Sequence, residues 1–168
     1  GSLSRAAPSP SQLRPMTIHV RVDDLSSAEV RALVAEHLVG MRGHTPKGHV
    51  HALAVESLLS KDITFFAAWI DGALCGCGAM RELDATTGEV KSMRTRAAFL
   101  RRGVGQAVLD AIQQLARQRG YRSLVLETGT GAAFDAAHAL YLRYGFAWRP
   151  VFGIYEQTSF NVFMQKDL

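Results

Sequence analysis

Apolar and polar residues alternate along this chain with two different periods, and these periods predict its secondary structure. A period of two residues is typical of a strand with one buried face, whereas a period of about 3.6 residues is typical of an amphipathic helix. Strand-like runs occupy residues 17–22, 63–70, 74–82, 89–95, 123–127, 146–152 and 161–165. Helix-like runs occupy residues 26–40, 51–59, 104–119 and 134–144, and the third of these is the most regular.

The order of these runs, β-α-α-β-β-β-α-β-α-β-β, predicts an α+β domain with a central mixed, mostly antiparallel seven-stranded sheet flanked by about four helices. The strands between residues 63 and 95 are expected to form an antiparallel meander, because Asp71-Gly72 and Thr86-Thr87-Gly88 are turn sequences. A chain of 168 residues fits a single domain, which we place at residues 16–168. Residues 1–15 are rich in Ser, Pro and Ala and are expected to be a disordered tail.

Composition narrows the class of protein. Hydrophobic residues make up 48% of the chain, which is enough for a packed core, and the longest apolar runs are too short to cross a bilayer. Because no secretory signal is visible either, we expect a cytoplasmic protein with no membrane partner. A phosphate-bearing small ligand and an ordinary solvated surface explain the net charge of +4 equally well. No dense basic run with interleaved aromatic residues occurs, so no nucleic-acid partner is expected.

The two cysteines, Cys75 and Cys77, fall in one predicted strand. Strand alternation places both on the same face, where they cannot easily bridge each other. No second cluster of Cys or His completes a zinc site, so we expect two buried reduced thiols and no metal.

A glycine-bearing turn precedes the most regular helix. Residues 100–107 read Leu-Arg-Arg-Gly-Val-Gly-Gln-Ala, and Gly103 and Gly105 allow a ligand to approach the backbone closely. The N–H groups of such a turn, with the partial positive charge of the helix N-terminus, form a cradle for a pyrophosphate. A dinucleotide fingerprint would need a third glycine near Val108, and a nucleoside triphosphate loop would need a Lys-Ser/Thr pair that is missing. The remaining alternative is a glycine-rich helix start without a ligand.

Two segments together resemble the GCN5-related N-acetyltransferase (GNAT) superfamily. Its acetyl-CoA signature, R/Q-x-x-G-x-G/A, matches Gly103-Val104-Gly105, although Leu100 stands in the R/Q position. Its A-x-x-L-Y-x-x-x-G-F segment matches residues 137–146, although Phe134 replaces an Asn that often precedes this segment. The two motifs are specific in combination and weak singly.

The resemblance covers roughly residues 17–168 and, through residues 91–95 and 126–129, extends to a bacterial branch of small one-domain members. It implies that acetyl-CoA is the cosubstrate, that no metal takes part, and that an amine attacks the thioester directly in a ternary complex. In the family, the end of the fourth strand pairs with the pantetheine arm, and a free N–H, here near Met93, faces the thioester oxygen. The residues so implied to bind acetyl-CoA are Met93, Arg94, Thr95, Arg101, Arg102, Gly103, Val104, Gly105 and Gln106. Because Leu100 cannot supply a polar side chain, we expect backbone N–H groups to bind the phosphates.

The resemblance also implies two catalytic side chains. Tyr141 matches the family tyrosine that protonates the leaving thiolate, and Glu89 stands where histone-type members have a glutamate base. About 20 Å of strand separates Glu89 from Thr95, so Glu89 would act through water. The alternatives are a packed tyrosine and a solvent-facing turn glutamate. Glu127 is a second candidate for the base, and either carboxylate could instead bind a cationic acceptor.

The acceptor side of the site is less defined. In this fold, residues 24–62 would form a wall of the acceptor site, and the candidate substrate-binding residues are Glu127, His51 and Tyr155. We expect an N-acetyltransferase that moves an acetyl group from acetyl-CoA to the amine of a small molecule or amino-acid-like acceptor. Many relatives are dimers, so a homodimer is a family-level expectation. The alternatives are a non-catalytic acyl-CoA-binding or regulatory module, and a transferase of another acyl group.

Overall fold

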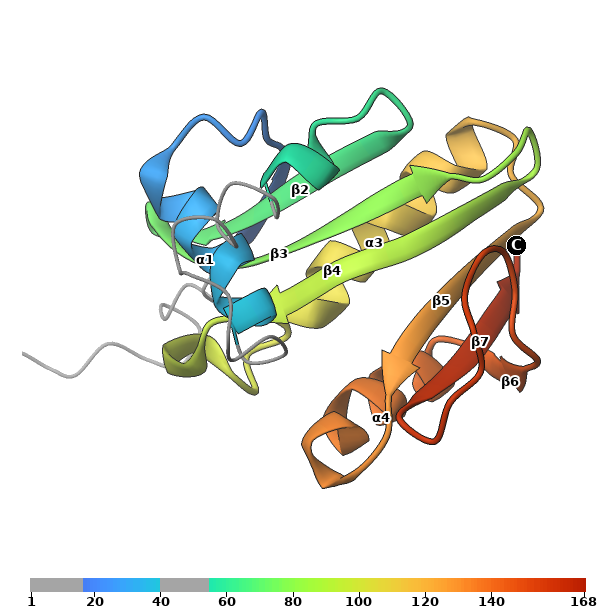
Figure 1. Ribbon diagram of the computed structural model, residues 1–168. Coiled ribbons are helices and arrows are strands. Elements are labelled where there is room, and N and C mark those ends of the chain that lie inside the picture. Colours follow the sequence, from blue (N-terminus) through green and yellow to red (C-terminus); the bar gives the residue numbers. More distant parts are fainter. Residues whose placement is uncertain (1–16, 40–54) are drawn as a thin grey trace, which may run out of the picture.

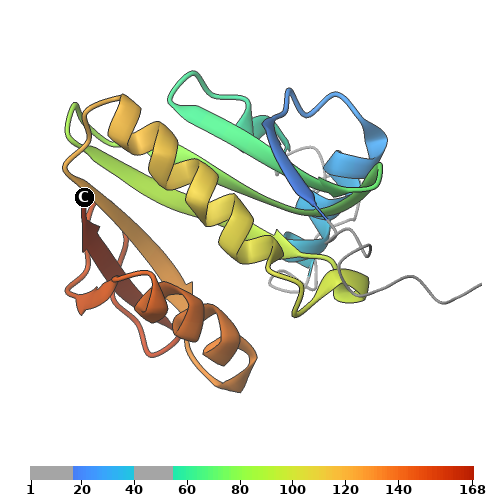
Figure 2. The same cartoon turned by 180° about the vertical axis from the view of Figure 1, so that it is seen from behind.

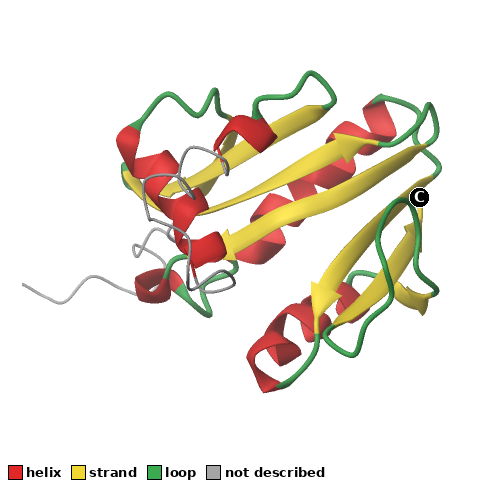
Figure 3. Cartoon of the chain, in the orientation of Figure 1, coloured by secondary structure: helices red, strands yellow, loops and turns green. Residues whose placement is uncertain are grey.

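The computed structural model describes residues 17–39 and 55–168, and a single mixed sheet organises them (Figure 1, Figure 3). The strands follow the spatial order β1-β2-β3-β4-β5-β7-β6 and pair antiparallel, except for the parallel pair β4–β5. Their bounds are β1 (Ile18–Val22), β2 (Ile63–Ile70), β3 (Ala73–Glu82), β4 (Thr87–Thr95), β5 (Ser123–Gly129), β6 (Ala147–Arg149) and β7 (Asn161–Asp167). The predicted α+β fold with a mostly antiparallel seven-stranded sheet is therefore confirmed.

Helices cover both faces of this sheet. Helix α1 (Ala28–Val39) lies on one face, and α3 (Val104–Gln118) and α4 (Asp135–Arg143) lie on the other, as the view from behind shows (Figure 2). Two short 3-10 turns, η2 (Ala97–Phe99) and η3 (Ala132–Phe134), precede α3 and α4. Residues 55–58 are helical and belong to the predicted helix 51–59, whose first part lies outside the described residues, as does the predicted tail. None of the helices within residues 17–39 and 55–168 is long and apolar enough to span a bilayer.

Helix α3 packs closely on β3 because two glycines of the strand face it. Val104, Val108 and Ile112 of α3 are buried against the sheet, as their spacing predicts. A Cβ atom at Gly76 would lie 2.6 Å from Cγ1 of Val104, and one at Gly78 would lie 2.6 Å from Cγ1 of Val108. Larger side chains at these strand positions would push α3, and the turn at its N-terminus, away from the sheet.

The sheet divides between β4 and β5. The two strands pair with each other only along their first parts, from Thr87 with Ser123 to Val90 with Leu126. Beyond these residues β4 continues to Thr95 and β5 to Gly129 without a mutual partner, and the two strands diverge (Figure 1). The last part of β4 therefore has β3 on one side only.

A β-bulge lies in the part of β4 that extends beyond its ladder with β5. Ala79 pairs with Lys91 and Cys77 pairs with Arg94, so Gly78 faces two residues of β4, Ser92 and Met93. Ser92 adopts a φ of 55°, in the left-handed region that non-glycine residues rarely occupy. The bulge turns the Met93 side chain toward α3 and the Arg94 side chain toward α1.

The structure corrects the prediction that Cys75 and Cys77 share a face. The pairs Ala68–Gly76 and Trp69–Leu74 leave Cys75 without a partner in β2, so a bulge shifts the alternation of β3. Cys75 consequently packs in the core on the α3 face and Cys77 in the core on the α1 face. Both are buried and free.

Several predicted boundaries also differ, and two of the differences have a local physical cause. Strand β4 begins at Thr87 and includes Gly88, because the Asp84 carboxylate accepts the Thr86 N–H at 2.8 Å and moves the turn upstream. Strand β6 has three residues and ends before Pro150, whereas the sequence predicted a strand to residue 152.

Candidate functional site

The turn before α3 presents free backbone N–H groups. Arg101 and Gly103 have φ angles of 62° and 83°, and Gly103 is the N-cap of the helix. The first helical hydrogen bond runs from the Ala107 N–H to the Gly103 carbonyl at 3.0 Å. Within the described part of the chain, no backbone or side-chain acceptor binds the N–H groups of residues 101–106. This is the arrangement that an anionic group requires.

Nothing obstructs the outer side of the turn at its first glycine. A Cβ atom at Gly103 would meet no atom within 4 Å. Arg101 and Arg102 are exposed beside it, and the Arg102 guanidinium lies 5.6 Å from the centre of the Phe99 ring. Leu100 is also exposed and supplies no polar group. Recognition of an anion at this turn would therefore combine backbone N–H groups with two exposed positive charges.

Helix α4 meets the start of α3 at this turn. A Cβ atom at Gly105 would lie 3.1 Å from Cδ2 of Leu140, so the two sequence motifs are in contact. The next residue, Tyr141, is buried, and its ring packs edge-on against Phe146 at 5.6 Å. Burial raises the pKa of the Tyr141 phenol to about 12. Tyr141 is thus a packed residue that keeps its proton, which is the state that a general acid needs.

The last part of β4 has a partner strand on one edge only. Met93, Arg94 and Thr95 all follow the last β4–β5 pair, and Arg94 and Thr95 pair with Cys77 and Gly76 of β3. Their opposite edge has no ladder partner in β5. The splayed strand pair that a pantetheine arm would need is therefore present.

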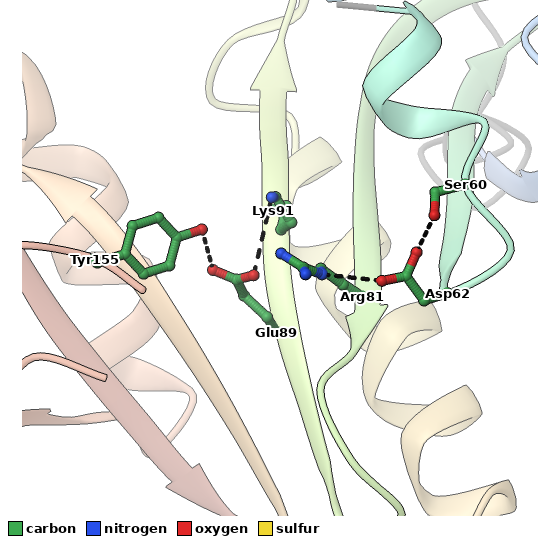
Figure 4. Close-up of polar contacts among 6 residues, drawn as sticks. All are labelled: Ser60, Asp62, Arg81, Glu89, Lys91 and Tyr155. Carbon is green, nitrogen blue, oxygen red and sulfur yellow. Dashed lines mark hydrogen bonds and ion pairs between the residues drawn. The ribbon is translucent and has the colours of Figure 1, made fainter. Parts of the chain in front are cut away.

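Glu89 is the centre of a polar cluster on the α1 face of the sheet (Figure 4). Its side chain is only 2% exposed. The Tyr155 hydroxyl donates a hydrogen bond to Oε2 at 2.6 Å, and Lys91 Nζ lies 3.9 Å from Oε1. Burial and the adjacent Glu89 carboxylate raise the pKa of the Tyr155 phenol. The alternative of a solvent-facing turn glutamate is wrong, because Glu89 lies inside β4 and is buried.

Arg81 joins this cluster from the neighbouring strand. It is the direct cross-strand partner of Glu89, so the two side chains leave the sheet on the same face (Figure 4). Its Nε donates to Oδ2 of Asp62 at 3.0 Å, and the Ser60 hydroxyl donates to the other carboxylate oxygen. The Ser60 hydroxyl lowers the pKa of Asp62, and Arg81 contributes to the same shift.

The other predicted acceptor residues have different positions. Glu127 is exposed on β5, two residues beyond the neighbour of Glu89, and accepts a hydrogen bond from Asn161 at 3.2 Å. His51 lies outside the described residues. His138 binds the Gly129 carbonyl at 2.9 Å through Nε2, which gives it a structural role.

Sequence reasoning missed three features of the site. Lys91 and Arg81 were not singled out, although Lys91 stands two residues from Glu89, the spacing of one strand face. The third is Phe134, which appeared only as a departure from the family motif. Its ring fills the space beside Gly129, where an added Cβ would lie 2.4 Å from it. Among the described residues, no group of three or more His, Cys, Asp or Glu side chains could hold a metal ion.

Comparisons with known proteins agree with this geometry. Residues 30–146 match the model of the acetyltransferase (GNAT) family. Two curated relatives are named as uncharacterized N-acetyltransferases. YsnE of Bacillus subtilis is 45% identical over 90% of this chain and all of its own length. YedL of Escherichia coli is 42% identical over 89% of this chain and 94% of its own.

Solved structures share the fold. A Klebsiella pneumoniae protein described as an acyl-CoA N-acyltransferase has a TM-score of 0.72 at 27% identity, covering 90% of this chain and 97% of its own. The PaiA N-acetyltransferase of Thermoplasma acidophilum, solved in complex with coenzyme A, has a TM-score of 0.70 at 16% identity. The match covers 91% of this chain and 100% of that protein. The chain therefore belongs to the acetyltransferase (GNAT) family and is an acyltransferase.

Proposed function

We propose that this enzyme transfers an acetyl group from acetyl-CoA to the amine of a small-molecule or amino-acid-like acceptor by direct attack in a ternary complex. The observation that carries the proposal is the contact between Gly105 and Leu140. It brings a turn with free N–H groups, which suits the pyrophosphate of the donor, next to a buried, protonated tyrosine, which suits protonation of the leaving thiolate. The coenzyme A complex of the Thermoplasma acidophilum neighbour supports the choice of donor.

The residues of this chain fit acetyl-CoA. The N–H groups of residues 101–106 and the N-terminus of α3 would hold the pyrophosphate. Met93, Arg94 and Thr95 would bind the pantetheine arm as an added strand, at the edge of β4 that β5 leaves open. When bound, acetyl-CoA supplies an acetyl group activated as a thioester.

The protein groups have separate tasks in the transfer. An N–H near Met93 would polarise the thioester carbonyl, a contribution of about 3 kcal/mol in comparable sites. As the C–N bond forms and the C–S bond breaks, Tyr141 would donate its proton to the sulfur. Glu89 would take the proton of the amine through water, because about 20 Å of strand separates it from Thr95.

The test is thiol release from acetyl-CoA across a panel of amines, with binding of acetyl-CoA measured separately by calorimetry. We expect binding without an amine and faster thiol release with a suitable amine. If acetyl-CoA binds and no amine accelerates release, the chain is a non-catalytic acyl-CoA-binding module. If a longer acyl-CoA outcompetes acetyl-CoA in the same assay, the transferred group is a different acyl chain.

A further inference from the structure

Two buried polar side-chain atoms lack a hydrogen-bond partner in the described part of the chain. They are Oε1 of Glu89 and Nε of Arg94. One is a hydrogen-bond acceptor of a carboxylate, and the other is a donor of a guanidinium. Both belong to β4, and both side chains leave it on the α1 face. Buried polar atoms are nearly always hydrogen-bonded, so this pair of exceptions on one strand face marks a place where a water or a ligand group would bind.

Lys91 stands between them on the same face. Its Nζ lies 3.9 Å from Oε1 of Glu89, beyond hydrogen-bond distance, and it donates to no other described residue. Arg94 has one charged neighbour, Glu36 of α1, at 3.7 Å from Nε. The Glu36 side chain is 62% exposed, so water screens this pair and the Glu36 carboxylate is free to turn away. The face of β4 therefore carries two cations, of which Arg94 has a buried Nε without a hydrogen-bond partner and Lys91 has only a long ion pair with Glu89.

Lys91 and Arg94 lie where an acceptor would approach the donor. Lys91 and Arg94 flank the bulge at Ser92 and Met93, beyond the last pair of β4 with β5. The turn that would bind the donor phosphates starts α3, whereas these charges lie on the opposite face, under α1. An acceptor that approaches Met93 from the α1 face meets Lys91 and Arg94 first.

We propose that the acceptor carries a carboxylate as well as its amine, as an amino acid does, and that Lys91 and Arg94 bind this carboxylate. The proposal rests on the proposed acetyl transfer and names its acceptor class. A carboxylate offers oxygen acceptors to both cations, and the ammonium of the same molecule offers donors to Glu89 or to a water between them. A simple amine would offer no acceptor to either cation and would be repelled by them.

Matched acceptors test the proposal. Each trio consists of an amino acid, its carboxamide and the amine that lacks the carboxyl carbon, and kcat/KM is measured for each by thiol release. We expect the amino acid of at least one trio to exceed its carboxamide and its amine by about 10-fold or more, since hydrogen bonds to charged groups are involved. Equal kcat/KM values within every active trio would overturn the proposal.

Variants assign the preference to the two cations. Arg94→Gln and Lys91→Gln should each reduce by about 10-fold the preference for the amino acid over its carboxamide, measured as the ratio of their kcat/KM values. Arg96→Gln is the matched control, because Arg96 also pairs with a glutamate of α1, Glu29, at 3.5 Å. Thermal unfolding of each variant separates a folding defect from a binding defect. If the variants raise KM for acetyl-CoA instead, the cations bind the donor and the proposal is wrong.

Failure of this inference differs from failure of the proposed function. If no amine of any class accelerates thiol release, acetyl transfer itself is refuted. If amines accelerate release but the carboxylate makes no difference, only the acceptor class is refuted.

Discussion

The Tyr155 hydroxyl donates a 2.6 Å hydrogen bond to Oε2 of Glu89, although 66 residues separate them in the sequence. Tyr155 belongs to the loop between β6 and β7, and its ring packs near Phe152 and Phe163 at 5.4 and 6.1 Å. The loop thus passes over β5 and β7 and reaches β4 on the far side of the division in the sheet. Its hydrogen bond occupies one oxygen of Glu89 and leaves the other directed toward Lys91 (Figure 4).

Replacing Tyr155 with Phe should lower kcat by about 10-fold, with acetyl-CoA affinity unchanged. The expected size follows from the loss of a hydrogen bond to a charged group, roughly 1.5–3 kcal/mol, which also orients the proposed base. Steady-state kinetics and calorimetry measure the two quantities. Tyr121→Phe is the control, since the Tyr121 hydroxyl donates to the Glu82 carboxylate at 2.8 Å away from the predicted site residues. An equal loss in both variants would show that the effect is structural.

Tyr141→Phe should lower kcat by about 100-fold or more, the range for loss of a general acid. Because burial raises the pKa of Tyr141 to about 12, the protonated form predominates at every pH below that value. The wild-type kcat should therefore show no decline from this group up to about pH 10, where an ordinary phenol is already half ionised. A pH profile of kcat checks this.

A second tyrosine of the same helical segment provides the control. Burial and the Asp110 carboxylate also raise the pKa of Tyr144, which caps α4 at its C-terminus. Tyr144→Phe should leave kcat within about 3-fold of the wild type. A decline of wild-type kcat centred below pH 10 that disappears in Tyr141→Phe would contradict the assignment.

Gly129→Ala should destabilise the fold by about 1–3 kcal/mol, because the new methyl group would lie 2.4 Å from the Phe134 ring. Chemical denaturation measures the free energy of unfolding. In the double variant Gly129→Ala/Phe134→Ala, the steric conflict is removed, so the double variant should lose less than the two single losses together. Additive losses would mean that the ring moves aside at no cost.

Both cysteines should resist thiol reagents at pH 8 while the protein is folded. Burial raises the pKa of Cys77 to about 12 and also raises the pKa of Cys75, so the reactive thiolate of each residue is scarce at pH 8. Labelling followed by mass spectrometry should show two modified thiols only after denaturation. Rapid labelling of either residue in the native protein would contradict the buried positions.

The sequence predicted the fold and the position of the glycine turn before α3 because both depend on local patterns. The spacing of Val104, Val108 and Ile112 defines α3, and Gly103 and Gly105 mark the turn at its start. The burial of Glu89 and its bond to Tyr155 were not predictable in this way. A charged residue near a turn sequence is usually exposed, and the Tyr155 loop has no periodic pattern to place it. The two bulges, at Cys75 and at Ser92, arise from pairing between strands and leave no local signal.

The divergence of β4 and β5 also determines how the molecule can open without unfolding. The residues 87–90 and 123–126 form the only ladder between the two strands, and it lies at one end of them. Thermal breathing should therefore concentrate at the opposite end, where backbone amides of β4 and β5 should exchange with deuterium faster than those of the shared ladder. A donor bound between the strands would hold the two halves of the sheet together. The enzyme should therefore be most flexible just after the donor is released.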